Sequence, residues 1–151
     1  NLLIAAGSVR PVRGLLLCCG LLSCIAADAD GPPVVSPQRI EGARQLDAEA
    51  MIELATATPE LVIIDSRVDA SRNYGHIEGS LSLADVDTDC ASLEALLGGP
   101  DAPVLFYCNG PKCGRSARAV EAALACGYRS VYWFRGGVYE WQTKGYPLLR
   151  D

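Results

Sequence analysis

Two cysteines lie five positions apart in the segment VLFYCNGPKCGRSARA, between an apolar run and a helical pattern. A loop that leaves a strand and enters a helix can aim several N–H groups at one point, and the dipole of that helix favours an anion there. A thiolate is such an anion, so we expect the pKa of Cys108 to fall well below the free value of about 8.5. The segment therefore predicts Cys108 as a nucleophile.

The rest of this loop is expected to bind the substrate. Two glycines let the backbone curl without Cβ clashes, and Lys112 and Arg115 supply positive charge for an anionic substrate. The predicted substrate-binding residues are Asn109, Gly110, Pro111, Lys112, Cys113, Gly114 and Arg115.

Short apolar runs alternate with helical patterns along the chain, and these elements must position the loop. Strands are expected at 38–44, 61–64, 81–83, 104–107 and 130–134. Helices are expected from an Asp47 cap to 56–59, at 68–74, around 93–97, from Arg115 to a cap at Gly127, and at 138–144. Alternation of this kind predicts an α/β fold with a mainly parallel sheet and helices on both faces. In such folds, sites form where strands end.

The first residues carry a targeting pattern. The apolar run 14–27 follows Arg10 and Arg13 and leads into small residues, which is typical of a signal peptide. It is shorter than the roughly 20 residues that a membrane span needs. We expect 1–29 to be a cleaved signal peptide, 30–38 a linker and 39–151 the folded domain. A lipoprotein-type cleavage with a lipid on Cys24 is the rival interpretation.

Charge and composition exclude several classes of function. The chain has 151 residues, of which 50% are hydrophobic and 21% charged, as expected for one globular domain after a leader. Its net charge is −5 and it has no Lys/Arg run, so it is a poor candidate for nucleic-acid binding. Because His76 is the only histidine and the loop cysteines lack a second ligand pair, we expect no metal and no cofactor.

Four motifs in order resemble those of single-domain rhodaneses, a sulfurtransferase family, and in particular its exported bacterial members. The resemblance covers roughly Ala43 to Leu149. It rests on a strand ending in Asp-x-Arg, a Gly-His-Ile-x-Gly turn, the Tyr-Cys loop with its helix, and a closing Gly-Gly-x-x-x-Trp with Gly-x-Pro. In this chain these are 62–67, 75–80, 107–119 and 135–147.

The resemblance implies a rhodanese-like α/β/α domain with three layers and a five-stranded sheet. It also implies a persulfide on Cys108, with thiosulfate as the usual test donor and a thiol or another thiophilic group as acceptor. One departure is the spacing, because the family's Cys-x4-Arg is Cys-x6-Arg here. A longer loop could admit a larger anion than thiosulfate.

Cys113 replaces a glycine of the family pattern and has two interpretations. It could resolve a Cys108 persulfide or sulfenate, leaving a disulfide that a thioredoxin-like reductant reopens. That role requires the two Cα atoms to lie within about 7 Å. Alternatively, Cys113 only fills a position in a longer loop. Sequence spacing does not decide between the two.

Other residues are expected to be structural. Cys90 and Cys126 are either buried thiols or a disulfide. Asp65 and Arg67 are expected to hold strand ends and helix caps together, with a position of Arg67 facing the pocket as the alternative. We expect His76 to stabilise a turn and the two tryptophans to lie in the core.

The sequence therefore predicts an exported, periplasmic sulfurtransferase that uses Cys108. One rival is a thiol–disulfide or oxyanion reductase that uses Cys108 and Cys113. The other is a non-catalytic module that carries or senses sulfur.

Overall fold

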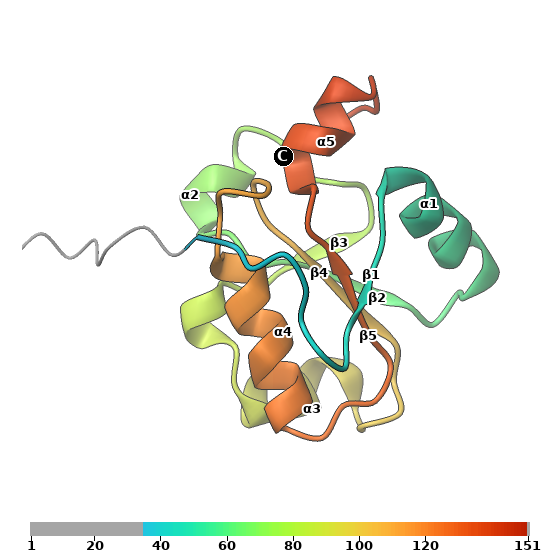
Figure 1. Cartoon of the computed structure of the whole chain (residues 1–151), viewed down its shortest axis with the longest axis vertical. Coiled ribbons are helices and arrows are strands. Elements are labelled where there is room, and N and C mark those ends of the chain that lie inside the picture. The colour runs from blue at the N-terminus through green and yellow to red at the C-terminus, as the bar shows by residue number, and fades with distance from the viewer. Residues whose placement is uncertain (1–34, 151) are drawn as a thin grey trace, which may run out of the picture.

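Five parallel strands form one sheet at the centre of the molecule (Figure 1). The computed structural model describes residues 35–150, so the predicted leader and most of the linker lie outside the described residues. The strand order is β1-β5-β4-β2-β3. The strands are β1 (Arg44–Gln45), β2 (Val62–Asp65), β3 (Ser80–Ser82), β4 (Val104–Tyr107) and β5 (Val131–Phe134). The predicted α/β class and the parallel five-stranded sheet are confirmed.

Helices cover both faces of this sheet, which gives three layers. In Figure 1, α3 and α4 lie on one side of the sheet, and α1 and α5 lie on the other. The helices are α1 (Ala48–Ala57), α2 (Asp69–Arg72), α3 (Cys90–Leu97), α4 (Arg115–Ala125) and α5 (Gly137–Thr143), with a 3-10 turn, η1, at Asp85–Asp87.

Alternate residues of each strand enter two separate cores, because successive strand side chains point to opposite faces. Phe106 and Trp133 pack under α3 and α4, whereas Leu105, Tyr107 and Phe134 pack under α1 and α5. Burial of each such side chain contributes about 1.5–3 kcal/mol. Cys108 continues the alternation of β4 and so faces α4.

The neighbouring strands β2 and β4 mark a switch point in the sheet. From β2 the chain continues to β3 at one edge, and from β4 it continues to β5 toward the other edge. The loops that leave these two strands therefore diverge, and the carboxyl ends of β2 and β4 are where a ligand crevice is expected in such folds. Cys108 follows β4 directly and lies at this position.

The first predicted strand is the main error in the expected elements. Only Arg44 and Gln45 pair with β5, whereas the sequence predicted a strand over 38–44. A turn intervenes, in which the Ala43 N–H donates to the Ile40 carbonyl at 3.2 Å and Gly42 has a φ of +88°. The other strands and helices agree with the prediction within a few residues.

Caps and one cross-link fix the helix ends. Asp47 caps α1 as predicted, because its side chain accepts a hydrogen bond from the Ala50 N–H at 2.9 Å. Of the two alternatives for Cys90 and Cys126, the structure contains the disulfide, which joins the start of α3 to the end of α4. Within residues 35–150, no helix is both long and apolar enough to cross a membrane.

Candidate functional site

Cys108 lies at the bottom of the loop that joins β4 to α4. It is only 1% exposed. Its thiol donates to the Cys113 carbonyl at 3.2 Å, and its sulfur lies 3.2 Å from the Ser116 hydroxyl. Ser116 in turn accepts a hydrogen bond from the Trp133 indole N–H at 2.9 Å. The sulfur is therefore held in place by a core tryptophan through one serine.

The first half of the loop is fixed by the start of α5. The Val138 N–H donates to the Cys108 carbonyl at 3.0 Å, and the Tyr139 N–H donates to the Asn109 carbonyl at 2.9 Å. This approach requires Gly137, whose φ is +55° and where a Cβ would lie 2.2 Å from the Cys108 oxygen. The Gly-Gly motif at 136–137 therefore supports the cysteine loop, a role that the sequence did not indicate.

The thiol that is stabilised as an anion is Cys113, which corrects the prediction made for Cys108. The interaction with the Cys108 side chain lowers the pKa of Cys113 most, to about 6. The backbone N–H groups of Arg115 and Asn109 and the charge of Arg115 lower this pKa further. Partial burial of Cys113 has the opposite effect and raises it. The same contact, burial and the negative charge on Cys113 raise the pKa of Cys108.

The physical reason is the path of the longer loop. The N–H groups that were expected to favour a thiolate at Cys108 favour one at Cys113 instead. Only the hydroxyl and the backbone N–H of Ser116 lower the pKa of Cys108. The effects of Cys113 and of burial, which raise this pKa, are larger. The lowered pKa therefore belongs to the more accessible of the two thiols.

Comparisons with known proteins identify this architecture. A family model of the rhodanese-like domain matches residues 45–144. The chain belongs to the rhodanese-like domain family. No curated protein matches its sequence.

Solved structures share the rhodanese-like fold at low sequence identity. The BH2092 protein from Bacillus halodurans is 19% identical, with a TM-score of 0.62 over 72% of this chain and 77% of that one. A human single-domain sulfurtransferase is 20% identical, with a TM-score of 0.54 over 68% and 97%. A thiosulfate sulfurtransferase from Pseudomonas aeruginosa is 24% identical, with a TM-score of 0.58 over 72% of this chain and 20% of that one.

In this rhodanese-like domain, Arg115 is held by a carboxylate that the sequence analysis missed. Arg115 Nη1 lies 2.8 Å from Asp85 Oδ1, and Arg118 Nε lies 2.7 Å from Asp85 Oδ2. The side chain of Asp85 is fully buried, whereas that of Arg115 is 33% exposed. Asp85 belongs to no motif, and only the fold brings η1 to the start of α4. Arg115 is thus fixed beside both thiols, whose charges contribute to raising its pKa after that of Asp85.

A hollow of about 530 Å³ opens beside the exposed part of the loop. Its described lining contains Cys113 and Lys112 but not Cys108. The remaining lining residues are Asn109, Gly110, Pro111 and Tyr139. Among the predicted substrate-binding residues, Gly114 is buried at the start of α4 and Lys112 is exposed. The loop therefore brings the Cys113 thiol, the exposed Lys112 side chain and an open hollow together.

The Asp-x-Arg and Gly-His-Ile motifs form a buried polar cluster beneath the site. Asp65 accepts from Arg67 Nη2 at 2.7 Å and from the Tyr107 hydroxyl at 2.9 Å. Arg67 also donates to the Gly75 carbonyl at 2.7 Å. Burial and the Asp65 charge raise the pKa of Tyr107 to about 12, so its hydroxyl stays protonated. Asp65 and Arg67 therefore join the end of β2 to the turn at Gly75, as predicted, but the start of α2 has no side-chain cap. Arg67 also faces a hollow of about 250 Å³ that Asn109 lines with it. The His76 backbone pairs with Leu149.

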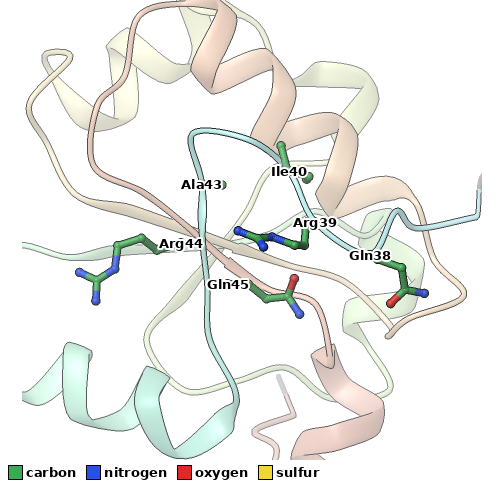
Figure 2. Close-up of a pocket in the computed structure, with 6 residues that line it drawn as sticks. All are labelled: Gln38, Arg39, Ile40, Ala43, Arg44 and Gln45. Carbon is green, nitrogen blue, oxygen red and sulfur yellow. The ribbon is translucent and has the colours of Figure 1, made fainter.

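A second hollow lies at the β1 edge and shares no residue with the cysteine loop (Figure 2). Figure 2 shows that Arg39 extends toward the backbone of β1, whereas Arg44 extends away from it on the other side. Arg44 Cζ lies 5.4 Å from the centroid of the Tyr132 ring, so the guanidinium makes a cation–π contact with that ring. This hollow has no nucleophile and no carboxylate in its described lining. Among the described residues, no group of three or more His, Cys, Asp or Glu is placed to hold a metal ion.

Proposed function

We propose that this rhodanese-like protein is a sulfurtransferase that takes sulfane sulfur from a small anionic donor as a cysteine persulfide and passes it to a thiophilic acceptor. The observation that carries the proposal is the pair of free thiols at the switch point of the sheet, one of which has its pKa lowered to about 6. A thiol with that pKa is mostly thiolate at neutral pH, and the thiolate is the nucleophile.

The loop has the parts that such a transfer needs. The thiolate attacks the outer sulfur of a donor such as thiosulfate, the S–S bond of the donor breaks, and sulfite leaves. The product is a persulfide anion, which the N–H groups of the loop and Arg115 can stabilise. Cys108, the carrier expected from the sequence, is one of two candidate carriers, because Cys113 shares the loop.

The donor is proposed to be an anion that fits the hollow beside Cys113. Lys112 lines this hollow and is exposed, and the charge of Arg115 lowers the pKa of Cys113 in the same loop. Two additional loop residues distinguish this chain from the Cys-x4-Arg pattern that it resembles, so donors larger than thiosulfate belong in the assay. An organic persulfide and an alkyl thiosulfonate extend the series.

The test is the intact mass of the reduced protein before and after each donor is added. We expect a gain of about 32 Da, or, when the second thiol responds, release of one sulfide per chain. The double variant Cys108→Ser/Cys113→Ser should show neither. Wild-type protein that shows neither with any donor would contradict the proposal. A persulfide that neither cyanide nor a thiol discharges would indicate a sulfur-carrying or sensing module instead.

A second candidate function is thiol–disulfide or oxyanion reduction by Cys108 and Cys113. The interaction between the two thiols favours it. Cys113 makes the largest contribution to the raised pKa of Cys108, and Cys108 makes the largest contribution to the lowered pKa of Cys113. This function predicts a loss of about 2 Da that reduction reverses, without any sulfane donor, when the protein meets a disulfide or an oxyanion substrate.

We also propose that the protein is exported, with a thioredoxin-like dithiol as its reductant. The apolar run 14–27 after two arginines supports export. The Cys90–Cys126 disulfide agrees with an oxidising compartment such as the periplasm. Mass analysis of the mature N-terminus would show whether cleavage occurs after residue 29 or whether Cys24 is lipidated.

A further inference from the structure

We propose that the Ser66 hydroxyl is a further hydrogen-bond donor to Cys108, engaged when the Cys108 sulfur gives up its proton and attacks the donor. This inference rests on the proposed sulfur-transfer function with Cys108 as the carrier. Ser66 is the middle residue of the Asp-x-Arg motif, and its side chain takes no part in the polar cluster that Asp65 and Arg67 form.

Ser66 is fully buried, and its hydroxyl is the one polar group of the residue that is not in use. Its exposed fraction is 0%, and among the described residues its Oγ has no hydrogen-bond partner. Its N–H donates to the Tyr107 carbonyl at 2.9 Å, and its carbonyl accepts from the Asp85 N–H at 3.2 Å. Because a buried polar group without a partner costs stability, a hydroxyl kept in this state points to a ligand or a reacting group nearby.

The sheet places Ser66 beside Cys108. Asp65 pairs with Tyr107 in the parallel register of β2 and β4, so the next residues along the two chains, Ser66 and Cys108, lie opposite each other. The Asp65 carboxylate meets the Tyr107 hydroxyl on one face of the sheet, and successive side chains alternate, so Ser66 and Cys108 share the face that α4 covers. Neighbouring strands lie about 4.8 Å apart, which brings the serine hydroxyl within reach of the cysteine sulfur.

The partners that Cys108 has as a thiol show when another donor is needed. The Cys108 thiol donates to the Cys113 carbonyl at 3.2 Å, and a carbonyl oxygen can hold this sulfur only while the sulfur carries a proton. The other partner, the Ser116 hydroxyl at 3.2 Å, is itself bonded by the Trp133 indole N–H. A Cys108 thiolate therefore loses the carbonyl as a partner and accepts a hydrogen bond from Ser66 on the side of the sheet.

The hydrogen bond favours the first step of the transfer. The Cys108 proton passes to water, the thiolate bonds to the outer sulfur of thiosulfate, and the electron pair of the broken S–S bond leaves with sulfite. Ser66 keeps its own proton and forms no covalent bond. Hydrogen bonds to an anion are stronger than those to a neutral group, so Ser66 stabilises the thiolate more than the thiol.

The first test measures the reactivity of Cys108 in full-length protein that carries Cys113→Ser, so that the loop has one thiol. We expect Ser66→Ala to slow iodoacetamide labelling of the tryptic peptide that contains Cys108 about 10-fold, because thiolate is the reactive form and one hydrogen bond to it is lost. Sulfur loading from thiosulfate should slow by a similar factor. Ser80→Ala is the matched control, a buried serine on the Tyr107 face, and should change either rate by less than about twofold.

The second test is stability, which separates this role from a structural one. The Ser66 hydroxyl has no partner to lose, so Ser66→Ala should melt at or above the temperature of the parent protein. Ser80→Ala should melt about 3 °C lower, because the Ser80 hydroxyl donates to the Ile77 carbonyl at 2.7 Å and lies 3.0 Å from the Tyr107 hydroxyl. In urea, Cys108 should be labelled at the same rate in all variants.

Each contrary result has a separate meaning. If Ser66→Ala leaves labelling and loading of Cys108 unchanged, or slows them only together with a lower melting temperature, Ser66 is not the proposed donor and the sulfurtransferase proposal stands. If wild-type protein loads but Cys113→Ser does not, Cys108 is not the carrier and this inference fails alone. If wild-type protein gains no sulfur and loses no thiols with any donor, the proposed function fails, and the role of Ser66 in the attack fails with it.

Discussion

The four cysteines of the described domain form two pairs that lie at opposite ends of one helix. Cys108 and Cys113 lie at the start of α4, whereas Cys126 caps its other end and is bonded to Cys90. The start of a helix carries partial positive charge and stabilises a thiolate, and its end carries partial negative charge and does not. The same residue type therefore serves as a reactive anion at one end and as a cross-link at the other.

The two cysteine pairs also differ in whether they are bonded and in what holds them. The Cys90–Cys126 bridge spans 36 residues of sequence and fixes α3 to α4, with Cα atoms 5.4 Å apart. The other two cysteines are both free, and their loop is held by hydrogen bonds from α5. Position relative to helix ends and sheet therefore separates structural from reactive cysteines, which their spacing in the sequence does not.

The largest expected effect is on sulfur loading. Cys108→Ser/Cys113→Ser should lower loading by at least about 1000-fold, because the nucleophile is removed. Cys90→Ala/Cys126→Ala should keep loading per folded chain within about twofold. Intact mass after thiosulfate measures both. The comparison breaks if loss of the cross-link abolishes loading in protein that is still folded.

The cross-link should matter for stability instead. Cys90→Ala/Cys126→Ala should lower the free energy of unfolding by about 4 kcal/mol, since the bridge closes a 36-residue loop in the unfolded chain. Urea denaturation of the oxidised wild type and the variant measures this difference. A change below about 1 kcal/mol would show that the bridge does not act as a stabilising cross-link.

Gly137 tests how the reactive loop is held. Gly137→Ala should cost about 3 kcal/mol, because its Cβ would lie 2.2 Å from the Cys108 carbonyl oxygen in a left-handed backbone. Gly145→Ala is the matched control: its φ is +82° but nothing lies within 4 Å of the added Cβ, so about 1 kcal/mol is expected. Thermal and urea unfolding compare them. Equal costs would mean that the loop does not depend on this close approach.

Asp85 tests how the charge of Arg115 is positioned. Asp85→Asn should lower the free energy of unfolding by about 2 kcal/mol, because a fully buried carboxylate that pairs with Arg115 and Arg118 is lost. It should also move the pH midpoint of Cys113 alkylation, since Arg115 is no longer fixed. An unchanged midpoint and an unchanged free energy of unfolding would contradict the role of Asp85 in positioning Arg115.

Lys112 is expected to have the smallest effect. Lys112→Gln should raise the KM for thiosulfate about threefold and leave kcat unchanged, because an exposed charge attracts the anion without touching the reacting sulfur. The difference should shrink as salt is added. Steady-state kinetics at two ionic strengths measure it. A large fall in kcat would instead place Lys112 among the groups that act on the reaction itself.

Much of this arrangement could be predicted because it depends on local sequence. The apolar runs at 62–64 and 104–107 indicated buried parallel strands, and the glycines and cations after Tyr107 indicated a site. Asp65 and Arg67 lie two positions apart, so their pairing also follows from short-range geometry.

The rest depends on contacts between segments that are distant in sequence. The Cys90–Cys126 bond spans 36 residues and had an unbonded alternative. Asp85 reaches Arg115 only through the fold, and no motif marks it. The sulfur that receives the loop N–H groups is set by the path of a loop with two extra residues. For that reason the lowered pKa was predicted for Cys108 but is found for Cys113.

The most direct test of the central claim is to locate the first sulfur in wild-type protein. After a brief exposure to thiosulfate, the persulfide is blocked by alkylation and the chain is digested with trypsin. Cleavage after Lys112 places Cys108 and Cys113 in different peptides. We predict that an added sulfur, about 32 Da, is found on one of these two peptides. Wild-type protein in which neither peptide gains sulfur and the two do not become joined by a disulfide would contradict this account.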